Sequence, residues 1–136
     1  MANITAAAVN ELRKRTGVGM MDCKKALVEC DGDMDKAIDY LREKGQKLAA
    51  KRADRDASEG AVLATVNADK TFAAVIMMNC ETDFVAKNED FVAFTREVLQ
   101  TAVDAKAKSL EEVMALTING LSVETMIVEQ VAKIGE

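Results

Sequence analysis

The sequence of 136 residues has no histidine, no proline and no tryptophan, and its only aromatic residues are one tyrosine and four phenylalanines. Without histidine, imidazole-based catalytic triads and His-ligated zinc or haem sites are excluded. Neither a GxxxxGK[ST] loop nor a GxGxxG fingerprint is present, so the chain is not expected to hold a nucleotide phosphate itself. No spacing marks a paired-carboxylate site, and serine or cysteine nucleophiles have no histidine to activate them. The sequence therefore predicts a protein that is not an enzyme, with no catalytic residues, no cofactor and no metal site.

The sequence also lacks a long hydrophobic run. No apolar stretch approaches the roughly 20 residues that span a bilayer. The first residues have neither the charged start nor the apolar stretch of a secretory signal. A formal net charge of −5 argues against the whole chain being a nucleic-acid binder. We therefore expect a cytoplasmic protein with no membrane contact and no direct nucleic-acid contact.

Cysteine is scarce, and the three present are Cys23, Cys30 and Cys80. They form no CxxC pair, which disfavours a zinc or thioredoxin-type site. If Cys23 and Cys30 share a helix, a separation of about 10 Å is too great for a disulfide. We expect small buried hydrophobic residues with free thiols.

Charge divides the chain. Residues 1–55 have a basic excess and residues 56–136 an acidic excess. The positive charge is concentrated where we expect a basic linker between two modules, a run that either faces a partner or is simply solvated: Arg42, Lys44, Lys47, Lys51, Arg52 and Arg55.

The first module is expected to be three short helices with tight loops. Thr5 is a candidate cap for the first helix, and Gly17 a candidate end. The second helix is expected over about residues 21–30. Asp33 is a candidate cap for the third helix, and Gly45 its expected end. Helical spacing links the apolar positions Ala8, Val9, Leu12, Cys23, Ala26, Leu27, Cys30, Met34, Ala37, Ile38 and Leu41. So small a bundle has little room for a catalytic cleft, so we expect it to present a surface.

The second module is expected to be α+β and to begin with a hairpin. Residues 62–67 alternate with the period of a strand, and residues 71–80 form a second β-rich run after a turn at 67–70. The two runs predict an antiparallel pair. A lone hairpin is marginal in water and needs a third strand or helix cover, so the sheet of this chain is expected to be incomplete.

Three helices are expected after the hairpin. Asn88 is a candidate cap for a long helix that reaches about Ala107. Ser109 begins a capping-box pattern for a short helix. A turn at residues 119–120 precedes a last helix from Ser122. The predicted fold class is therefore α+β, with a three-helix bundle followed by a hairpin and helices.

Two loops are candidate functional sites. Gly17 and Gly19 precede Met20 and Met21, a pattern that suggests an anion-binding helix start but fits an adaptable apolar contact surface better.

The second loop holds Thr82, Asp83, Phe84 and Val85, with an aromatic residue beside an acid between a strand end and a helix start. A protruding functional loop is one interpretation. The other is that Thr82 or Asp83 caps a turn and Phe84 packs in the core beside Phe91.

Several motifs resemble those of bacterial elongation factor Ts. The amino-terminal signature is the run from Arg15 to Leu27, RTGVGMMDCKKAL. A second signature is the run from Asn79 to Lys87, NCETDFVAK, and VAKIGE at the end of the chain is a third. The matches occur in order along the whole chain, and the two long motifs together are highly specific. The sequence is therefore identified as similar to the amino-terminal part of this family.

The resemblance implies a guanine-nucleotide exchange factor for the GTPase elongation factor Tu, bound in its GDP and nucleotide-free forms. It implies a domain of the ubiquitin-associated type over residues 1–55 and the amino-terminal part of an α+β core over residues 56–136. The implied partner-binding residues are Val18, Met20, Met21, Lys24 and Lys51. The residues implied to displace the partner's Mg²⁺ are Thr82, Asp83, Phe84 and Val85.

Family members ordinarily continue past VAKIGE into another strand and usually a second half-core. A truncated form that only binds elongation factor Tu, without full exchange activity, is therefore an alternative. A plain interaction module and a small enzyme are two further alternatives. Exposed edges and uncovered apolar faces also favour self-association.

Overall fold

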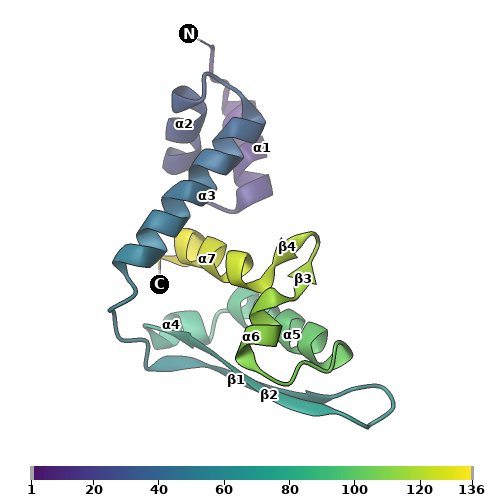
Figure 1. Ribbon diagram of the computed structural model, residues 1–136. Helices are drawn as coiled ribbons and strands as arrows, with labels where there is room; N and C mark the ends of the chain where they lie inside the picture. Colours follow the sequence, from purple (N-terminus) through teal and green to yellow (C-terminus); the bar gives the residue numbers. More distant parts are fainter. Residues whose placement is uncertain (1, 136) are drawn as a thin grey trace. The chain divides into compact units, whose positions relative to one another are not determined.

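The computed structural model describes residues 2–135 and has the predicted α+β fold (Figure 1). In chain order the elements are α1 (Ala6–Thr16), α2 (Met20–Glu29), α3 (Met34–Lys51), β1 (Glu59–Val66), β2 (Ala73–Cys80), α4 (Asp83–Ala86), α5 (Glu89–Asp104), α6 (Leu110–Ala115), β3 (Thr117–Ile118), β4 (Leu121–Ser122) and α7 (Val123–Ile134). The described residues form two compact units. The first runs to Ala53 and takes in the chain from Val128 onward, and the second is Asp54–Ile127. No helix within residues 2–135 is long and apolar enough to span a bilayer.

The first unit is built around the three predicted helices. The Thr5 side chain accepts a hydrogen bond from the Ala8 amide, and Asp33 caps α3 in the same way through the Lys36 amide. Gly17 ends α1 with φ +68°, a left-handed conformation that glycine adopts without strain. The three helices enclose one apolar core: Val9, Leu12, Val18, Cys23, Ala26, Leu27, Ala37 and Leu41.

The predicted end of the third helix at Gly45 is wrong, because α3 continues to Lys51. Gly45 is buried, and a Cβ placed on it would lie 2.9 Å from the Cβ of Ala132 on α7. Glycine here allows two helix backbones to approach, a tertiary reason that outweighs its low helix propensity. The predicted basic linker is also wrong over most of its length, because the basic residues from Arg42 to Lys51 lie on this helix.

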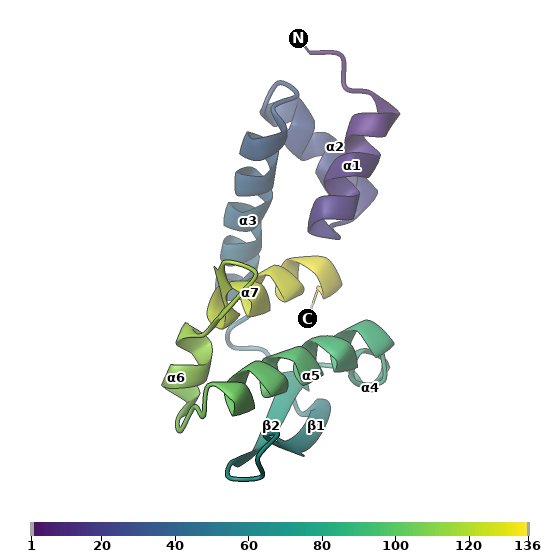
Figure 2. The ribbon, with the colours of Figure 1, turned by 90° about the vertical axis from the view of Figure 1, so that its right-hand side faces the viewer.

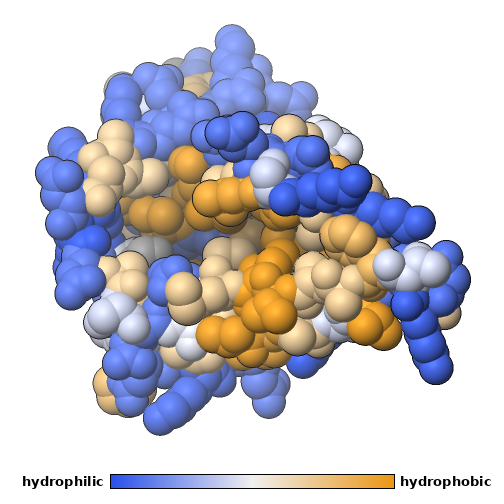
Figure 3. All heavy atoms as spheres, turned by 60° about the horizontal axis from the view of Figure 1, so that its bottom comes forward, coloured by the Kyte–Doolittle hydropathy of each residue, from blue (hydrophilic) through white to orange (hydrophobic). Residues whose placement is uncertain are grey.

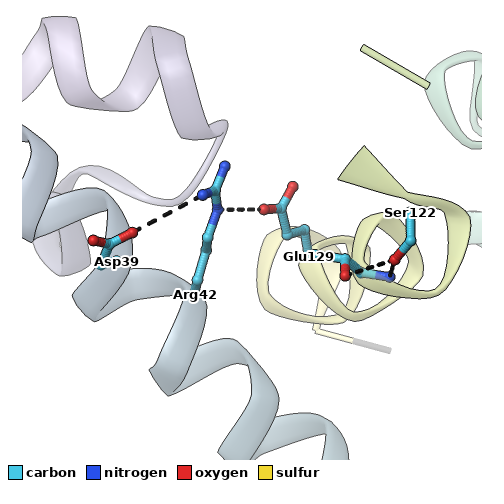
Figure 4. Close-up of polar contacts among 5 residues, drawn as sticks. Asp39, Arg42, Ser122 and Glu129 are labelled. Carbon is cyan, nitrogen blue, oxygen red and sulfur yellow. Dashed lines mark hydrogen bonds and ion pairs between the residues drawn. The ribbon is translucent and has the colours of Figure 1, made fainter. Parts of the chain in front are cut away.

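The last turns of α7 pack within the first unit against α3. Figure 4 shows the guanidinium of Arg42 reaching from α3 to the carboxylate of Glu129, with Nε 2.8 Å from Oε1. Asp39, one turn before Arg42, lies 4.0 Å from the same guanidinium. At the other end of α7, the Ser122 hydroxyl accepts the Thr125 amide, which confirms the predicted helix start.

The second unit begins with the predicted antiparallel hairpin. β1 and β2 pair along their whole length, from Glu59 opposite Cys80 to Val66 opposite Ala73. The Asn67 side chain accepts the amides of Thr71 and Phe72 and so holds the connecting turn. Within residues 2–135 this sheet has two strands.

Helices cover one face of the hairpin. α5 lies across it and starts at the predicted cap, where Asn88 accepts the amides of Asp90 and Phe91 (Figure 2). α6 starts at the predicted Ser109, and the short strands β3 and β4 flank the predicted turn at residues 119–120. α5 therefore supplies the helix cover that the hairpin needs. The core of this unit consists of Phe94, Val98, Ile118 and Val123, with Ile76, Met78, Val113, Met114, Leu116, Met126 and Ile127 packed against it.

The other face of the hairpin is apolar and exposed. Val62 on β1 lies opposite Met77 on β2, and their exposed fractions are 60% and 62%. Val66 and Val75 lie on the same face and are also exposed.

A groove of about 800 Å³ runs beside β2, between that strand and the helices α5, α6 and α7. Figure 3, which turns the lower side of Figure 1 toward the viewer, shows apolar side chains gathered on this side.

Candidate functional site

The segment after β2 forms α4, a single helical turn. It begins within the four residues that the resemblance implies displace the partner's Mg²⁺, here called the wedge residues: Thr82, Asp83, Phe84 and Val85. Thr82 caps this turn, with its hydroxyl 3.5 Å from the Val85 amide nitrogen. Phe84 is 84% exposed, more than any other large apolar side chain of residues 2–135. The interpretation that Phe84 packs in the core is therefore wrong, whereas Phe91 does lie there with 5% exposure. The ring of Phe84 is available to a partner.

Asp83 is also on the surface, one turn before Lys87. Its Oδ2 lies 3.4 Å from the Nζ of Lys87, and the side chains are 53% and 79% exposed. An exposed pair of this kind adds little to stability. Val85 differs from both, because it is half-buried.

A second ion pair lies at the start of this segment. Nε of Arg55 is 2.9 Å from Oε1 of Glu81. The Glu81 side chain is only 17% exposed, so it is much more buried than the Asp83 side chain, which is 53% exposed. The pair connects the chain just before β1 to the chain just after β2.

The predicted partner-binding residues lie in the first unit, and most are exposed. Met20 is 49% and Met21 67% exposed at the start of α2, and Lys24 and Lys51 are exposed as well. Val18 differs from them, because it is 8% exposed and belongs to the core of the bundle. Gly19 caps α2 without a side-chain hydrogen bond. Two exposed methionines at this helix start favour the interpretation as an apolar contact surface.

The surface formed by Met20, Met21 and Lys24 is supported by a neighbouring ion pair. Nζ of Lys44 on α3 lies 2.8 Å from Oδ1 of Asp22 on α2. The hydrogen bond to Asp22 raises the pKa of Lys44 above its ordinary value. The pair joins α2 to α3, and Asp22 directly follows the exposed Met21 in the chain.

None of the three cysteines is in a disulfide. Cys23 and Cys80 are buried, and Cys30 is partly exposed. Burial raises the pKa of the Cys23 thiol, which keeps it protonated and unreactive near neutral pH. Among residues 2–135 no group of three or more Cys, Asp or Glu side chains is arranged to hold a metal ion.

Sequence analysis missed three features of these surfaces. Val28 is 57% exposed and follows Met21 by seven residues, so it extends the same face of α2; that spacing was visible in the sequence. The pair of Asp83 with Lys87 was also visible as a four-residue spacing. The pair of Arg55 with Glu81 had no local signal, because its members are far apart in the chain.

Comparison with known proteins finds two matching family models. The family model "Elongation factor Ts, mitochondrial, N-terminal" matches residues 1–49, and the model "Elongation factor TS" matches residues 81–136. The two matches contain the methionine surface on α2 and the whole of α4.

Curated relatives match along the full chain. Elongation factor Ts of Christiangramia forsetii is 57% identical over 136 residues, which is 100% of this chain and 49% of the relative. The proteins of the same name from Flavobacterium johnsoniae and Rhodopirellula baltica are 55% and 54% identical, with 42% and 41% of their lengths covered. The chain belongs to the elongation factor Ts family, and it spans about half or less of the length of these relatives.

Proposed function

We propose that this chain binds elongation factor Tu, in its GDP-bound and nucleotide-free forms, and accelerates the release of GDP. The observation that carries the proposal is Phe84, a phenylalanine that is 84% exposed on a one-turn helix. Exposing an aromatic ring forgoes about 2–3 kcal/mol of burial, which a solely structural residue would normally recover. A ring held in solvent beside a carboxylate is suited to insertion into a partner.

Docking is assigned to residues 1–55 and exchange to the core, residues 56–136. In the docking domain, Met20, Met21 and Lys24 supply an apolar contact flanked by positive charge, and Lys51 adds a second charge. Val18 is buried, so its part is to support the loop from beneath.

The exchange element consists of Thr82, Asp83, Phe84 and Val85. Thr82 caps the turn and Val85 holds it to the unit, while Asp83 and Phe84 approach the partner's Mg²⁺ site. Magnesium bridges phosphate oxygens and neutralises their charge, so disturbing it weakens the hold on GDP. By linkage, nucleotide with magnesium weakens the partner's hold on this chain by the same free energy. No covalent bond is made or broken, so the chain acts without enzymatic catalysis.

Such a factor works in the cytoplasm, without direct contact to nucleic acid or membrane. The exposed hairpin face and the chain's open sheet also favour self-association at high concentration.

Stopped-flow release of a fluorescent GDP analogue from elongation factor Tu tests the proposal. Release should accelerate with increasing concentration of the chain and then saturate. A titration of the same samples by calorimetry separates binding from exchange. Binding without acceleration would favour the alternative, a module that only binds elongation factor Tu. No binding would reject both.

A further inference from the structure

We infer that Arg55 is a positioning residue for α4 and acts through its ion pair with Glu81. The inference rests on the proposed function for its consequence in exchange, but its structural part concerns only this chain. Nε of Arg55 and Oε1 of Glu81 are 2.9 Å apart. Glu81 directly precedes Thr82, the cap of α4, so the pair acts at the point where the exchange element begins.

α4 needs an external restraint because it cannot fix its own position. It has four residues, too few for a helix to be stable alone, and none of them is buried. Val85 and Ala86 are partly buried where α4 contacts the hairpin and α5, and further support comes from its attachment points. On the side of β2, Cys80 is 2% exposed and its thiol donates to the Thr82 carbonyl at 3.2 Å. Arg55 adds a second support from a distant part of the chain.

The burial of Glu81 makes the ion pair effective. The Glu81 side chain is 17% exposed, so its attraction to a nearby guanidinium is screened by water less than that of a fully exposed pair. Arg55 precedes β1, whose first residue, Glu59, pairs with Cys80 at the end of β2. The ion pair therefore closes the open end of the hairpin, from which α4 projects.

Hydrogen exchange of the isolated chain tests the structural part directly. The amides of Ala86, Lys87 and Asn88 bond to carbonyls of residues 82–85 and report whether the turn is formed. In Arg55→Ala these amides should exchange about tenfold faster or more, whereas amides of α5 should be unchanged. Equal exchange rates in the variant and the parent would overturn the inference.

The GDP-release assay tests the functional part. Arg55→Ala should lower the maximal release rate by about tenfold, which corresponds to about 1.4 kcal/mol. The half-saturating concentration should change little, because Arg55 lies in the second unit, whereas the residues that supply the docking contact lie in the first: Met20, Met21, Lys24 and Lys51. A residue that merely stabilised the fold would instead reduce the amount of active protein and lower the melting temperature.

Two variants serve as controls. Arg15 forms a pair with Glu11 of the same length, 2.9 Å, and is 51% exposed against 53% for Arg55. Arg15→Ala should therefore leave the hydrogen exchange of residues 86–88 unchanged, and it serves as a control for that measurement alone, because Arg15 lies in the docking domain. Arg55→Lys keeps the charge and should recover most of the rate. A lysine variant as slow as the alanine variant would contradict a charge-based restraint.

The two hypotheses can fail separately. If the parent chain binds elongation factor Tu but does not accelerate GDP release, the proposed exchange function fails. Hydrogen exchange at residues 86–88 still decides whether Arg55 holds α4. If the parent accelerates release and Arg55→Ala changes neither measurement, the inference about Arg55 fails and the proposed function stands.

Discussion

Replacing Phe84 by alanine separates an exposed wedge from a core residue. A phenylalanine side chain buries about 200 Å² when fully enclosed. At 84% exposure, Phe84 keeps only about 30 Å² covered, which contributes about 0.8 kcal/mol. The loss of stability in Phe84→Ala should therefore be small, although the ring is large.

Phe91 provides the matched control, because it lies in the same unit at the start of α5 and is 5% exposed. Phe91→Ala removes a buried ring and should cost about 3–5 kcal/mol. For a unit of this size the melting temperature should fall by about 3–6 °C in Phe84→Ala and by at least about 12 °C in Phe91→Ala.

GDP release should follow the opposite order. Phe84→Ala should slow the stimulated release from elongation factor Tu while the chain remains folded. Asp83→Ala should slow it as well, and the double variant should show less than the sum of the two effects, because the residues act as one element. Circular dichroism and release rates are measured on the same samples. A sharply lowered melting temperature in Phe84→Ala together with an unchanged release rate would refute the wedge assignment.

Three further predictions concern the first unit. Replacing both Met20 and Met21 by Asp should weaken binding to elongation factor Tu by about 30-fold, or about 2 kcal/mol, with an unchanged melting temperature; calorimetric titration that gave parental affinity would reject the docking surface. Gly45→Ala should lower the free energy of unfolding by about 1–3 kcal/mol through the contact with Ala132, offset by about 1 kcal/mol of gained helix propensity. Urea unfolding measures the change, and a variant more stable than the parent would contradict that contact. Iodoacetamide at pH 8 should modify Cys30 first, because the other two thiols are buried; mass spectrometry that found equal rates at all three would contradict this.

Features set by local chemistry could be predicted from the sequence. Thr5, Asp33 and Asn88 each cap the expected helix, because a side-chain oxygen can satisfy the free amides of a first turn whatever the tertiary context. The antiparallel hairpin follows from the two-residue period and a turn after residue 66. Its register does not, because Val66 pairs with Ala73 and the connection is two residues longer than the turn expected at residues 67–70.

Features set by tertiary contact could not be predicted. Glycine is typical of helix ends, which is why Gly45 was expected to end the helix. The close approach of Ala132 explains why the helix continues through it. Whether Phe84 is exposed depends on whether the rest of the unit offers its ring a buried site. A helix of four residues is too short for hydrophobic periodicity to show which of its side chains is buried. The partner of Glu81 is equally non-local, since charge patterning relates only residues that share one element.

The exposed face of the hairpin determines which assays suit this chain. Val62, Val66, Val75 and Met77 offer apolar side chains to solvent in the folded state, next to an apolar groove. Environment-sensitive dyes that fluoresce on apolar surface should therefore bind before any heating and give a high starting signal. A dye-based thermal scan would then show a shallow or inverted transition even for a cooperatively folded protein. Unfolding is better followed by far-ultraviolet circular dichroism, which reports on the helices. The dye signal of the folded protein has another use: its decrease on addition of a binding partner measures how much of this face the partner covers.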